Sequence, residues 1–124
     1  MVNPFEQAVV VVPAHNELSH LPACLRSVTT AALCLPVPTL VVVVLDACDD
    51  GSDGLAGSFG QDVHFVSVDA GNVGAARAAG FEYARSECGQ GSEDNAWYAT
   101  TDADSAVPAD WLSAMSDPGL RGRL

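Results

Sequence analysis

Four short apolar runs along the chain predict β-strands, at residues 8–12, 39–45, 63–68 and 96–101. The first two runs are almost unbroken valine, which is typical of strands that are buried on both faces of a parallel sheet. Pro13 closes the first run. The pattern therefore predicts a sheet whose central strands have no face in water.

The segments between these strands have helical patterns. After the first strand, four apolar residues fall on one helical stripe, namely Leu18, Leu21, Leu25 and Val28. Asn16 precedes the stripe where a side-chain acceptor would satisfy free amides, so we expect it to be the N-cap. Composition predicts a short helix at 52–59, an alanine-rich helix at 72–85 and a loop at 87–95. Gly80 lies inside the alanine-rich helix at a cost of about 1 kcal/mol relative to alanine, which predicts close packing against a neighbour.

Strands that alternate with helices through short connections predict parallel βαβ units. The expected fold class is α/β, an open, Rossmann-like, mostly parallel sheet of about four strands flanked by helices. At 124 residues the chain fits a single domain, residues 1–124. Ligands of such sheets bind beyond the carboxyl ends of the strands, and a polar cluster follows each predicted strand here. We therefore expect one binding crevice at that edge.

The charge of the chain disfavours some partners. It has 16 acidic residues, no lysine and a formal net charge of −11. An acidic surface repels phosphate backbones, so nucleic-acid binding is disfavoured. A small anionic ligand can still bind where a helix N-terminus or a metal cation offsets the field.

The cysteines and the apolar runs give expectations about location. Neither the paired spacing of a zinc site nor a disulfide framework is present among Cys24, Cys34, Cys48 and Cys88, so we expect reduced cysteines in a cytoplasmic protein. The first residues lack a basic region followed by an apolar core, and no apolar run is long enough to span a bilayer. No signal peptide or transmembrane segment is predicted.

Two common nucleotide-binding loops are missing. The segment PAHNE after the first strand has no glycine, whereas a dinucleotide fold would have G-x-G-x-x-G there, so NAD binding is disfavoured. A chain without lysine cannot form a P-loop. A nucleotidyltransferase is disfavoured for a related reason, because it would normally have a glycine-rich, basic phosphate loop at this place.

Asp102 and Asp104 flank Ala103 at the end of the fourth predicted strand. In extended backbone the two carboxylates would point the same way, about two strand rises of ~3.3 Å apart. Carboxylates are preferred ligands of Mg²⁺ and Mn²⁺, which usually keep water and share substrate phosphates. By themselves the two residues also fit a second interpretation, an aspartate-rich turn that caps the next helix.

Four segments follow one another in a specific order: PAHNE after the first strand, an acidic cluster after the second, N-x-G-x-A-R at the start of the alanine-rich helix, and TDADS after the fourth strand. This combination resembles the family 2 glycosyltransferases of GT-A fold, over residues 9–112. The resemblance implies inverting transfer of a sugar from a nucleotide-diphospho-sugar to an acceptor hydroxyl, with Mg²⁺ or Mn²⁺ as the metal.

The resemblance also implies a set of site residues. The nucleotide-sugar site would comprise Pro13, Ala14, Glu17, Asp46, Arg77, Asp102 and Ala103. Within it, the first motif would hold the base and ribose, Asp46 would contact the base, and Arg77 would lie near the nucleotide. The metal ligands would be Asp104, which also meets the diphosphate, and Asp102, which meets the ribose or the metal.

Simpler interpretations stay open for several of these polar residues. Asn16 and Glu17 could be a cap and a first-turn acid, and Arg77 could pair with a surface acid. The polar residues at 49–53 fit turn and cap chemistry. Structural or exposed roles are expected for His15, His20 and His64. The start of the alanine-rich helix would be shaped by Asn72 and Gly74.

The chain departs from the family pattern after the TDADS segment. A complete family 2 catalytic domain continues through a further sheet and loops that bind the acceptor and present a carboxylate base. Only Asp110 and Asp117 follow as carboxylates, so the catalytic base is unknown. We expect a donor-binding half that is incomplete on the acceptor side. The alternative is a non-catalytic or degenerate nucleotide-binding or interaction module, with possible self-association through an uncovered sheet edge.

Overall fold

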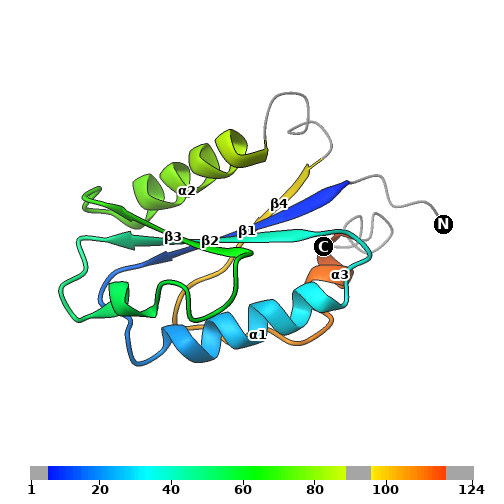
Figure 1. The fold of residues 1–124 in the computed structure, drawn as a ribbon, viewed down its shortest axis with the longest axis horizontal. Coiled ribbons are helices and arrows are strands. Elements are labelled where there is room, and N and C mark those ends of the chain that lie inside the picture. The colour runs from blue at the N-terminus through cyan, green and yellow to red at the C-terminus, as the bar shows by residue number, and fades with distance from the viewer. Residues whose placement is uncertain (1–5, 89–95, 117–124) are drawn as a thin grey trace.

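The computed structural model describes residues 6–88 and 96–116 (Figure 1). Its elements in chain order are β1 (Gln7–Ala14), α1 (Leu21–Leu33), β2 (Thr39–Asp46), the 3₁₀ helix η1 (Ser52–Leu55), β3 (Val63–Val68), α2 (Val73–Cys88), β4 (Ala96–Thr100) and α3 (Trp111–Ser116). The four strands form one parallel sheet in the order β3-β2-β1-β4. The expected α/β, Rossmann-like fold class is confirmed.

The strand order reverses direction beside β1. The chain moves outward from β1 to β2 and β3 on one side, and then returns to place β4 on the other side of β1. In open α/β sheets this reversal opens a crevice at the carboxyl ends of the strands. The crevice of this molecule therefore lies between β1 and β4.

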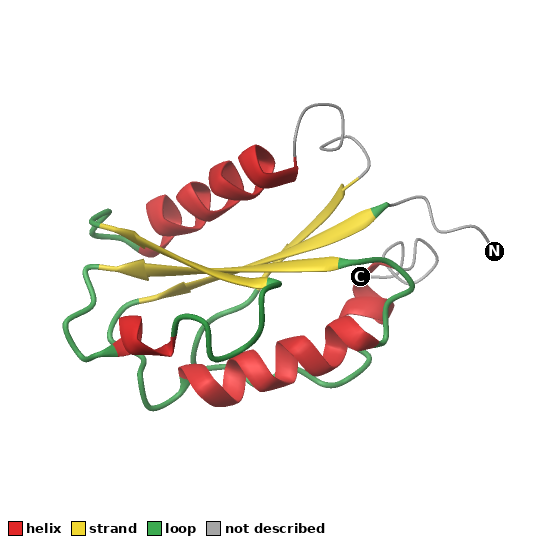
Figure 2. Cartoon of the chain, viewed as in Figure 1, coloured by secondary structure: helices red, strands yellow, loops and turns green. Residues whose placement is uncertain are grey.

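Helices cover both faces of the sheet (Figure 2). α1 and α3 lie on one face, and α2 lies on the other (Figure 1). Val10 and Val12 of β1 pack in the core cluster with α1, whereas Val9 and Val11 pack in the cluster with α2. All four of these valines are fully buried, and burial of such a side chain contributes about 1.5–3 kcal/mol. The unbroken valine runs thus follow from a sheet that is covered on both faces.

Gly80 lets α2 approach the sheet closely, as its position in the sequence predicts. A Cβ added at Gly80 would lie 2.5 Å from Cγ1 of Val11 and 2.8 Å from Cγ2 of Val44. No real side chain tolerates such contacts without a shift of the neighbours. Close packing at this glycine is therefore confirmed.

β1 continues through Pro13 to Ala14, two residues beyond the predicted end at Val12. The carbonyl of Val11 accepts the amide of Thr101 on the β4 side, and Pro13, two residues later, faces the same side. Pairing with β4 ends at Val11. The missing amide of Pro13 therefore costs no ladder hydrogen bond, and β1 stays paired with β2.

Other boundaries differ by a few residues. The short helix is a 3₁₀ turn over Ser52–Leu55, and the fourth strand ends at Thr100. α2 extends to Cys88, into residues that composition predicts as loop, and 89–95 lie outside the described residues. Three cysteines are free, as expected: Cys24, Cys34 and Cys48. Within the described ranges, no helix has the length and apolar character needed to cross a membrane.

Candidate functional site

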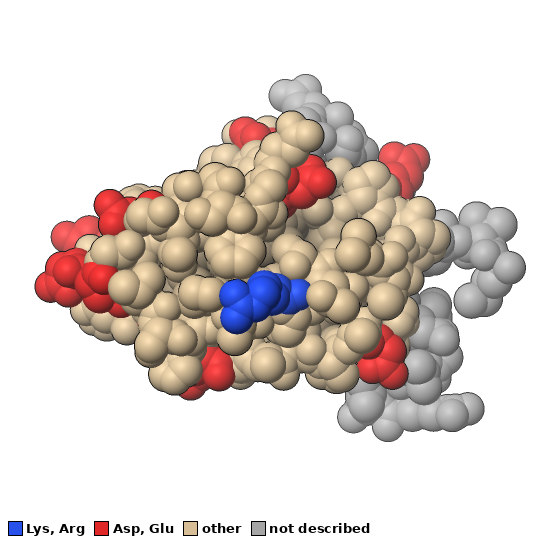
Figure 3. Space-filling model, turned by 60° about the horizontal axis from the view of Figure 1, so that its bottom comes forward, with Lys and Arg blue, Asp and Glu red and all other residues tan. Residues whose placement is uncertain are grey.

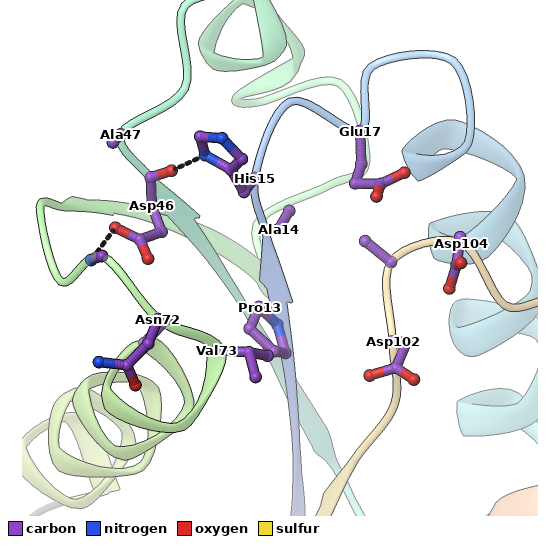
Figure 4. Close-up of a pocket in the computed structure, with 13 residues that line it drawn as sticks. Pro13, Ala14, His15, Glu17, Asp46, Ala47, Asn72, Val73, Asp102 and Asp104 are labelled. Atoms are coloured by element: carbon purple, nitrogen blue, oxygen red, sulfur yellow. Dashed lines mark hydrogen bonds between the residues drawn. The ribbon is translucent and has the colours of Figure 1, made fainter.

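A pocket of about 520 Å³ opens at the carboxyl ends of β1, β2 and β4, beside the start of α2 (Figure 4). Its walls come from the loops after these strands and from the first turn of the helix. The lining residues are Pro13, Ala14, His15, Glu17, Asp46, Ala47, Gly71, Asn72, Val73, Ala76, Asp102, Ala103 and Asp104. The crevice that the strand topology creates is thus a real cavity, and four carboxylates stand among its otherwise largely apolar walls.

Asp46 ends β2 at the back of the pocket and is only 6% exposed. Its Oδ1 accepts the backbone amides of Ala70 at 2.7 Å and Gly71 at 3.2 Å. These bonds satisfy one oxygen of a buried carboxylate, and among the described residues the other oxygen has no hydrogen-bond partner. Asp46 therefore fixes the loop before α2 and keeps one carboxylate oxygen as a spare hydrogen-bond acceptor at the pocket.

His15 lies beside Asp46, and its Nδ1 is 2.7 Å from the Asp46 backbone carbonyl (Figure 4). A carbonyl only accepts, so Nδ1 must carry the proton. In neutral His15 this leaves the lone pair of Nε2 as an acceptor at the pocket wall. His15 thus bridges the ends of β1 and β2, and it is a lining residue that sequence reasoning treated as merely structural or exposed.

Two residues next to these strand ends adopt left-handed backbone. Asn16 has φ of 53° and Ala47 has φ of 51°. Asparagine tolerates this region, but alanine pays about 1–2 kcal/mol there. Oδ1 of Asn16 accepts the amide of Asp49 at 2.8 Å, so it joins the two loops. The predicted N-cap role of Asn16 is wrong, because α1 begins at Leu21 with His20 as its N-cap residue.

Glu17 precedes α1 and faces the pocket from the loop after β1. Its Oε2 lies 2.9 Å from Nδ1 of His20, and its backbone carbonyl accepts the amides of His20 and Leu21. The backbone contacts make a turn that starts α1. The side chain is therefore held at the rim by one exposed histidine and remains accessible to a ligand.

The first turn of α2 forms the opposite wall. Oδ1 of Asn72 accepts the amide of Ala75 at 2.8 Å, which is an N-cap contact. This agrees with the expectation that Asn72 shapes the start of the helix. The N-terminus of this 16-residue helix borders the pocket, where its dipole favours negative charge.

Asp102 and Asp104 do not lie in extended backbone. The carbonyl of Asp102 accepts the amide of Ser105 at 3.1 Å, which closes a turn directly after β4. The strand-like geometry predicted for the pair is therefore wrong. Both aspartates still line the pocket, and Ala103 between them is buried at 3% exposure. The tight turn replaces the strand because β4 ends its pairing at Thr100.

Two side chains of α1 hold the turn after β4 in place. Sγ of Cys24 donates to the carbonyl of Asp102 at 3.5 Å, and Oγ of Ser27 accepts the amide of Val107 at 3.0 Å. Burial, with further contributions from the charges of Asp104 and Asp102, raises the pKa of Cys24 to about 11. The thiol therefore remains protonated near neutral pH and keeps its hydrogen for the Asp102 carbonyl.

Arg77 does not line the cavity but reaches Asp102 from α2. Its guanidinium nitrogen Nη2 lies 3.9 Å from Oδ1 of Asp102, and its Nε donates to Oγ1 of Thr100 at 3.3 Å. The pairing partner is thus an exposed carboxylate at the pocket, so the interpretation of Arg77 as the partner of a surface acid also holds.

The pocket is strongly acidic. Four of its lining residues are carboxylates, Glu17, Asp46, Asp102 and Asp104, and none is lysine or arginine. Acidic side chains also gather at the end of the molecule where the strands end (Figure 3). A cation that enters with an anion would offset this field, in addition to the helix dipole of α2.

The donor set fits a hard divalent cation. Carboxylate oxygens from Asp102 and Asp104 suit Mg²⁺ or Mn²⁺, which take their remaining ligands from water and phosphate. In the part of the chain that the structure describes, no group of three His, Cys, Asp or Glu side chains could hold a metal ion. These residues thus fit a cation shared with a phosphate ligand better than one in an all-protein cage.

Most sequence-predicted site residues come together. Pro13, Ala14, Glu17, Asp46, Asp102, Ala103 and Asp104 all line one pocket, and Arg77 contacts it through Asp102. Sequence reasoning missed His15 as a wall residue and missed Thr100 altogether. The place of His15 within PAHNE was a usable signal, but nothing in the sequence marks Thr100.

The neighbouring acidic cluster has mainly structural roles, as expected. Oδ2 of Asp50 accepts the amide of Leu18, and Oδ1 accepts both the amide and the hydroxyl of Ser52. The hydroxyl contact of Ser52, with the other amide contacts, lowers the pKa of Asp50. His64 is also structural, because its Nδ1 lies 2.7 Å from the hydroxyl of Tyr83 on α2.

Comparison with protein-family profiles matches residues 9–118 to the family described as glycosyl transferase family 2. The matched span includes β1 from Val9 onward, the other three strands and every lining residue of the pocket. Comparison with curated proteins finds no match.

Proposed function

Because the chain belongs to glycosyl transferase family 2, we propose that it binds a nucleotide-diphospho-sugar with a divalent metal ion and serves transfer of the sugar to an acceptor hydroxyl. The observation that carries this proposal is the composition of the pocket. It lies at the reversal of strand order, it is large enough for part of a nucleotide, and its charged lining residues are all carboxylates.

Different walls of the pocket would bind different parts of the donor. Asp46 and His15, at the ends of β2 and β1, offer hydrogen-bond acceptors suited to the edge of a base. Pro13, Ala14 and Glu17 supply the rim on the β1 side, where the base and ribose would lie. The start of α2 offers a positive helix end to the anionic part of the donor.

The metal would be held by Asp104 and Asp102, which project from the turn after β4. A bound Mg²⁺ or Mn²⁺ would act as a Lewis acid on the diphosphate leaving group. Cys24 and Ser27 hold the turn in place from α1, so the two carboxylates face the ligand without much rearrangement.

The described residues offer few candidates for a catalytic base on the acceptor side. After Asp104 the only described carboxylate is Asp110, which precedes α3 and does not line the pocket. We therefore propose that residues 6–116 form the donor-binding part of a transferase, and we assign no catalytic base.

Calorimetry with UDP, GDP and TDP, each with and without Mn²⁺, tests this proposal. At least one nucleotide should bind to the wild type only when Mn²⁺ is present. Asp104→Ala should weaken that binding by about 10–100-fold, as loss of a metal-site group typically does. Asp62→Ala is the matched control, because Asp62 is exposed and precedes β3 at the opposite end of the sheet, away from the pocket.

Three outcomes are informative. Absence of any Mn²⁺-dependent binding in the wild type contradicts the proposed donor site. Equal losses in Asp104→Ala and Asp62→Ala would assign the effect to overall charge. Metal-dependent binding without sugar release from the corresponding nucleotide-sugar would favour a non-catalytic binding module.

A further inference from the structure

We propose that Thr100 is a positioning residue of this site, because its hydroxyl fixes the guanidinium of Arg77 beside Asp102. The inference rests on the proposed function and deepens it. Thr100 is the last residue of β4, lies two positions before Asp102, and is not a lining residue of the pocket.

The hydrogen-bond directions at Thr100 are determined by its partners. Oγ1 of Thr100 is 2.8 Å from the carbonyl of Val11, which can only accept, so the hydroxyl hydrogen points to β1. Nε of Arg77 is 3.3 Å from the same oxygen and can only donate. Thr100 therefore acts as donor to β1 and as acceptor from α2 at the same time.

This contact orients the rest of the guanidinium. With Nε bonded to Thr100, Nη2 of Arg77 lies 3.9 Å from Oδ1 of Asp102, which is an ion-pair distance but longer than a hydrogen bond. Asp102 is 68% exposed in its side chain and Arg77 is 34% exposed, so Coulomb attraction between them is screened by water. A screened pair of this kind holds its geometry poorly unless another group fixes one partner, and Thr100 is that group.

The arrangement has a direct consequence for the acidic pocket. Arg77 is the only arginine or lysine that contacts a pocket carboxylate in the described residues. It offsets part of the repulsion between Asp102 and Asp104 and restrains the Asp102 carboxylate from one side. Cys24 restrains the backbone carbonyl of the same residue. Thr100 thus helps to keep Asp102 in position to receive a cation together with a diphosphate.

Two substitutions at Thr100 separate this role from packing. Thr100→Val keeps the shape but removes the hydroxyl, whereas Thr100→Ser keeps the hydroxyl and removes a methyl group. Thr100→Val should weaken Mn²⁺-dependent binding of the nucleotide that the wild type prefers by about tenfold, near the lower end for outer-shell partners of metal ligands. Thr100→Ser should stay within about twofold of the wild type on the same scale. Thr29→Val is a matched control, because its hydroxyl also bonds to a backbone carbonyl, that of Leu25, but lies away from the pocket.

A second arm tests the connection through Arg77. In an Arg77→Gln background, Thr100→Val should cause no further loss of binding, since both changes remove the Thr100–Arg77 contact and the bond of Thr100 to Val11 does not reach Asp102. A ligand-free readout is the Nε–H signal of Arg77 in ¹H–¹⁵N spectra, assigned by its absence in Arg77→Lys. That signal should be protected from solvent exchange in the wild type and Thr100→Ser, and should lose protection in Thr100→Val.

The outcomes distinguish this inference from the proposed function. If the wild type shows no metal-dependent binding, the proposed function fails, and an unprotected Arg77 Nε–H in the wild type would overturn the positioning contact independently. If binding occurs but Thr100→Val and Thr100→Ser lose it equally, or the Thr100→Val loss persists in Arg77→Gln, the positioning role of Thr100 is overturned and the donor site stands. Thermal midpoints of all variants check that each is folded.

Discussion

Ala47 holds an unfavourable backbone conformation at the edge of the pocket. Its φ of 51° places it in the left-handed region, and its amide donates to the carbonyl of Val68 at 2.9 Å. The side chain of the neighbouring Asp46 accepts the amides of Ala70 and Gly71 in the loop before α2. Alanine is strained in this conformation, whereas glycine would not be, so the surrounding contacts must hold Ala47 in it.

Ala47→Gly should relieve that strain. Glycine loses more entropy on folding but avoids the left-handed penalty, so we expect the free energy of unfolding to stay equal or to rise by up to about 1 kcal/mol. Ala78→Gly in α2, an exposed helical position, should lower it by about 1 kcal/mol. Urea unfolding of both variants measures the difference, and equal losses would contradict the strained conformation.

Cys24 gives a prediction for alkaline pH. Its pKa is raised to about 11 in the folded protein, from an ordinary value of 9.0. Between these values the unfolded chain loses the thiol proton first, so stability should fall as pH rises, by up to about 1.4 kcal/mol per pH unit. The effect should vanish below pH 9, where both states keep the proton.

Comparison of the wild type with Cys24→Ala isolates this effect, because Tyr83, whose pKa is also raised by burial, remains in both proteins. Unfolding free energies from pH 8 to 11 should fall less steeply in Cys24→Ala. Asp104→Asn should lower the pKa of Cys24, since the charge of Asp104 helps to raise it. Parallel curves for the wild type and Cys24→Ala would refute the assigned cause.

Individual contacts were the least predictable part of the site. Asn16 has the composition of a helix cap, but its side chain binds Asp49, 33 residues later in the chain. Asp102 and Asp104 are spaced as in a strand, but a turn to Ser105 sets their direction. Local propensity cannot anticipate either outcome, because the Asn16 contact joins the loops after β1 and β2, and the turn at Asp102 follows the end of pairing between β4 and β1.

At the scale of elements, the contact between α2 and the sheet depends on one missing side chain. Gly80→Ala would place a Cβ at 2.5 Å from Val11 and 2.8 Å from Val44. The clash should cost about 1–3 kcal/mol and outweigh the gain in helix propensity of about 1 kcal/mol.

Gly74→Ala is a matched control within the same helix. A Cβ at Gly74 would meet only Oδ1 of Asn72, at an ordinary 3.5 Å. We expect it to leave the thermal midpoint unchanged or slightly higher, whereas Gly80→Ala should lower it. A stabilising Gly80→Ala would mean that α2 packs less closely than described.

The elements themselves follow well from periodicity. The third strand was predicted with its observed bounds, Val63–Val68, because polar turn residues flank a short β-branched run. The sequence predicts that the first strand ends before Pro13, whereas β1 ends at Ala14, because the sequence does not say which neighbouring strand each residue faces. That information appears only with the strand order, which lets a proline lie beside the end of β4.

At the scale of the whole molecule, the formal net charge of −11 should make folding sensitive to salt. Raising NaCl from about 0.01 M to about 0.15 M shortens the Debye length from about 30 Å to about 8 Å and weakens self-repulsion. The thermal midpoint should rise by a few degrees, since about 1 kcal/mol corresponds to roughly 4 °C for a domain of this size. A double variant, Asp53→Asn with Asp62→Asn, should show a smaller rise, and an equal rise would argue against a charge origin.

The location of the site was predictable because it depends on topology more than on contacts. Parallel strands end at one edge, so polar segments that follow β1, β2 and β4 must meet there. Seven of the predicted residues line the pocket for this reason. Thr100 could not be found in the same way, because its role comes from side-chain bonds to Val11 and Arg77.

The position of β4 in the sheet has a consequence for how the site comes apart. β4 pairs with β1 over five residues and has no strand on its other side in the described sheet, whereas β1 and β2 are each paired on both sides. Backbone amides of β4 should therefore exchange with deuterium through local opening, at a lower free energy than those of β1 and β2. Because Asp102 and Asp104 follow β4 directly, fraying of this one strand would dismantle the acidic pocket while the valine core stays folded, and a bound ligand would slow exchange in β4 first.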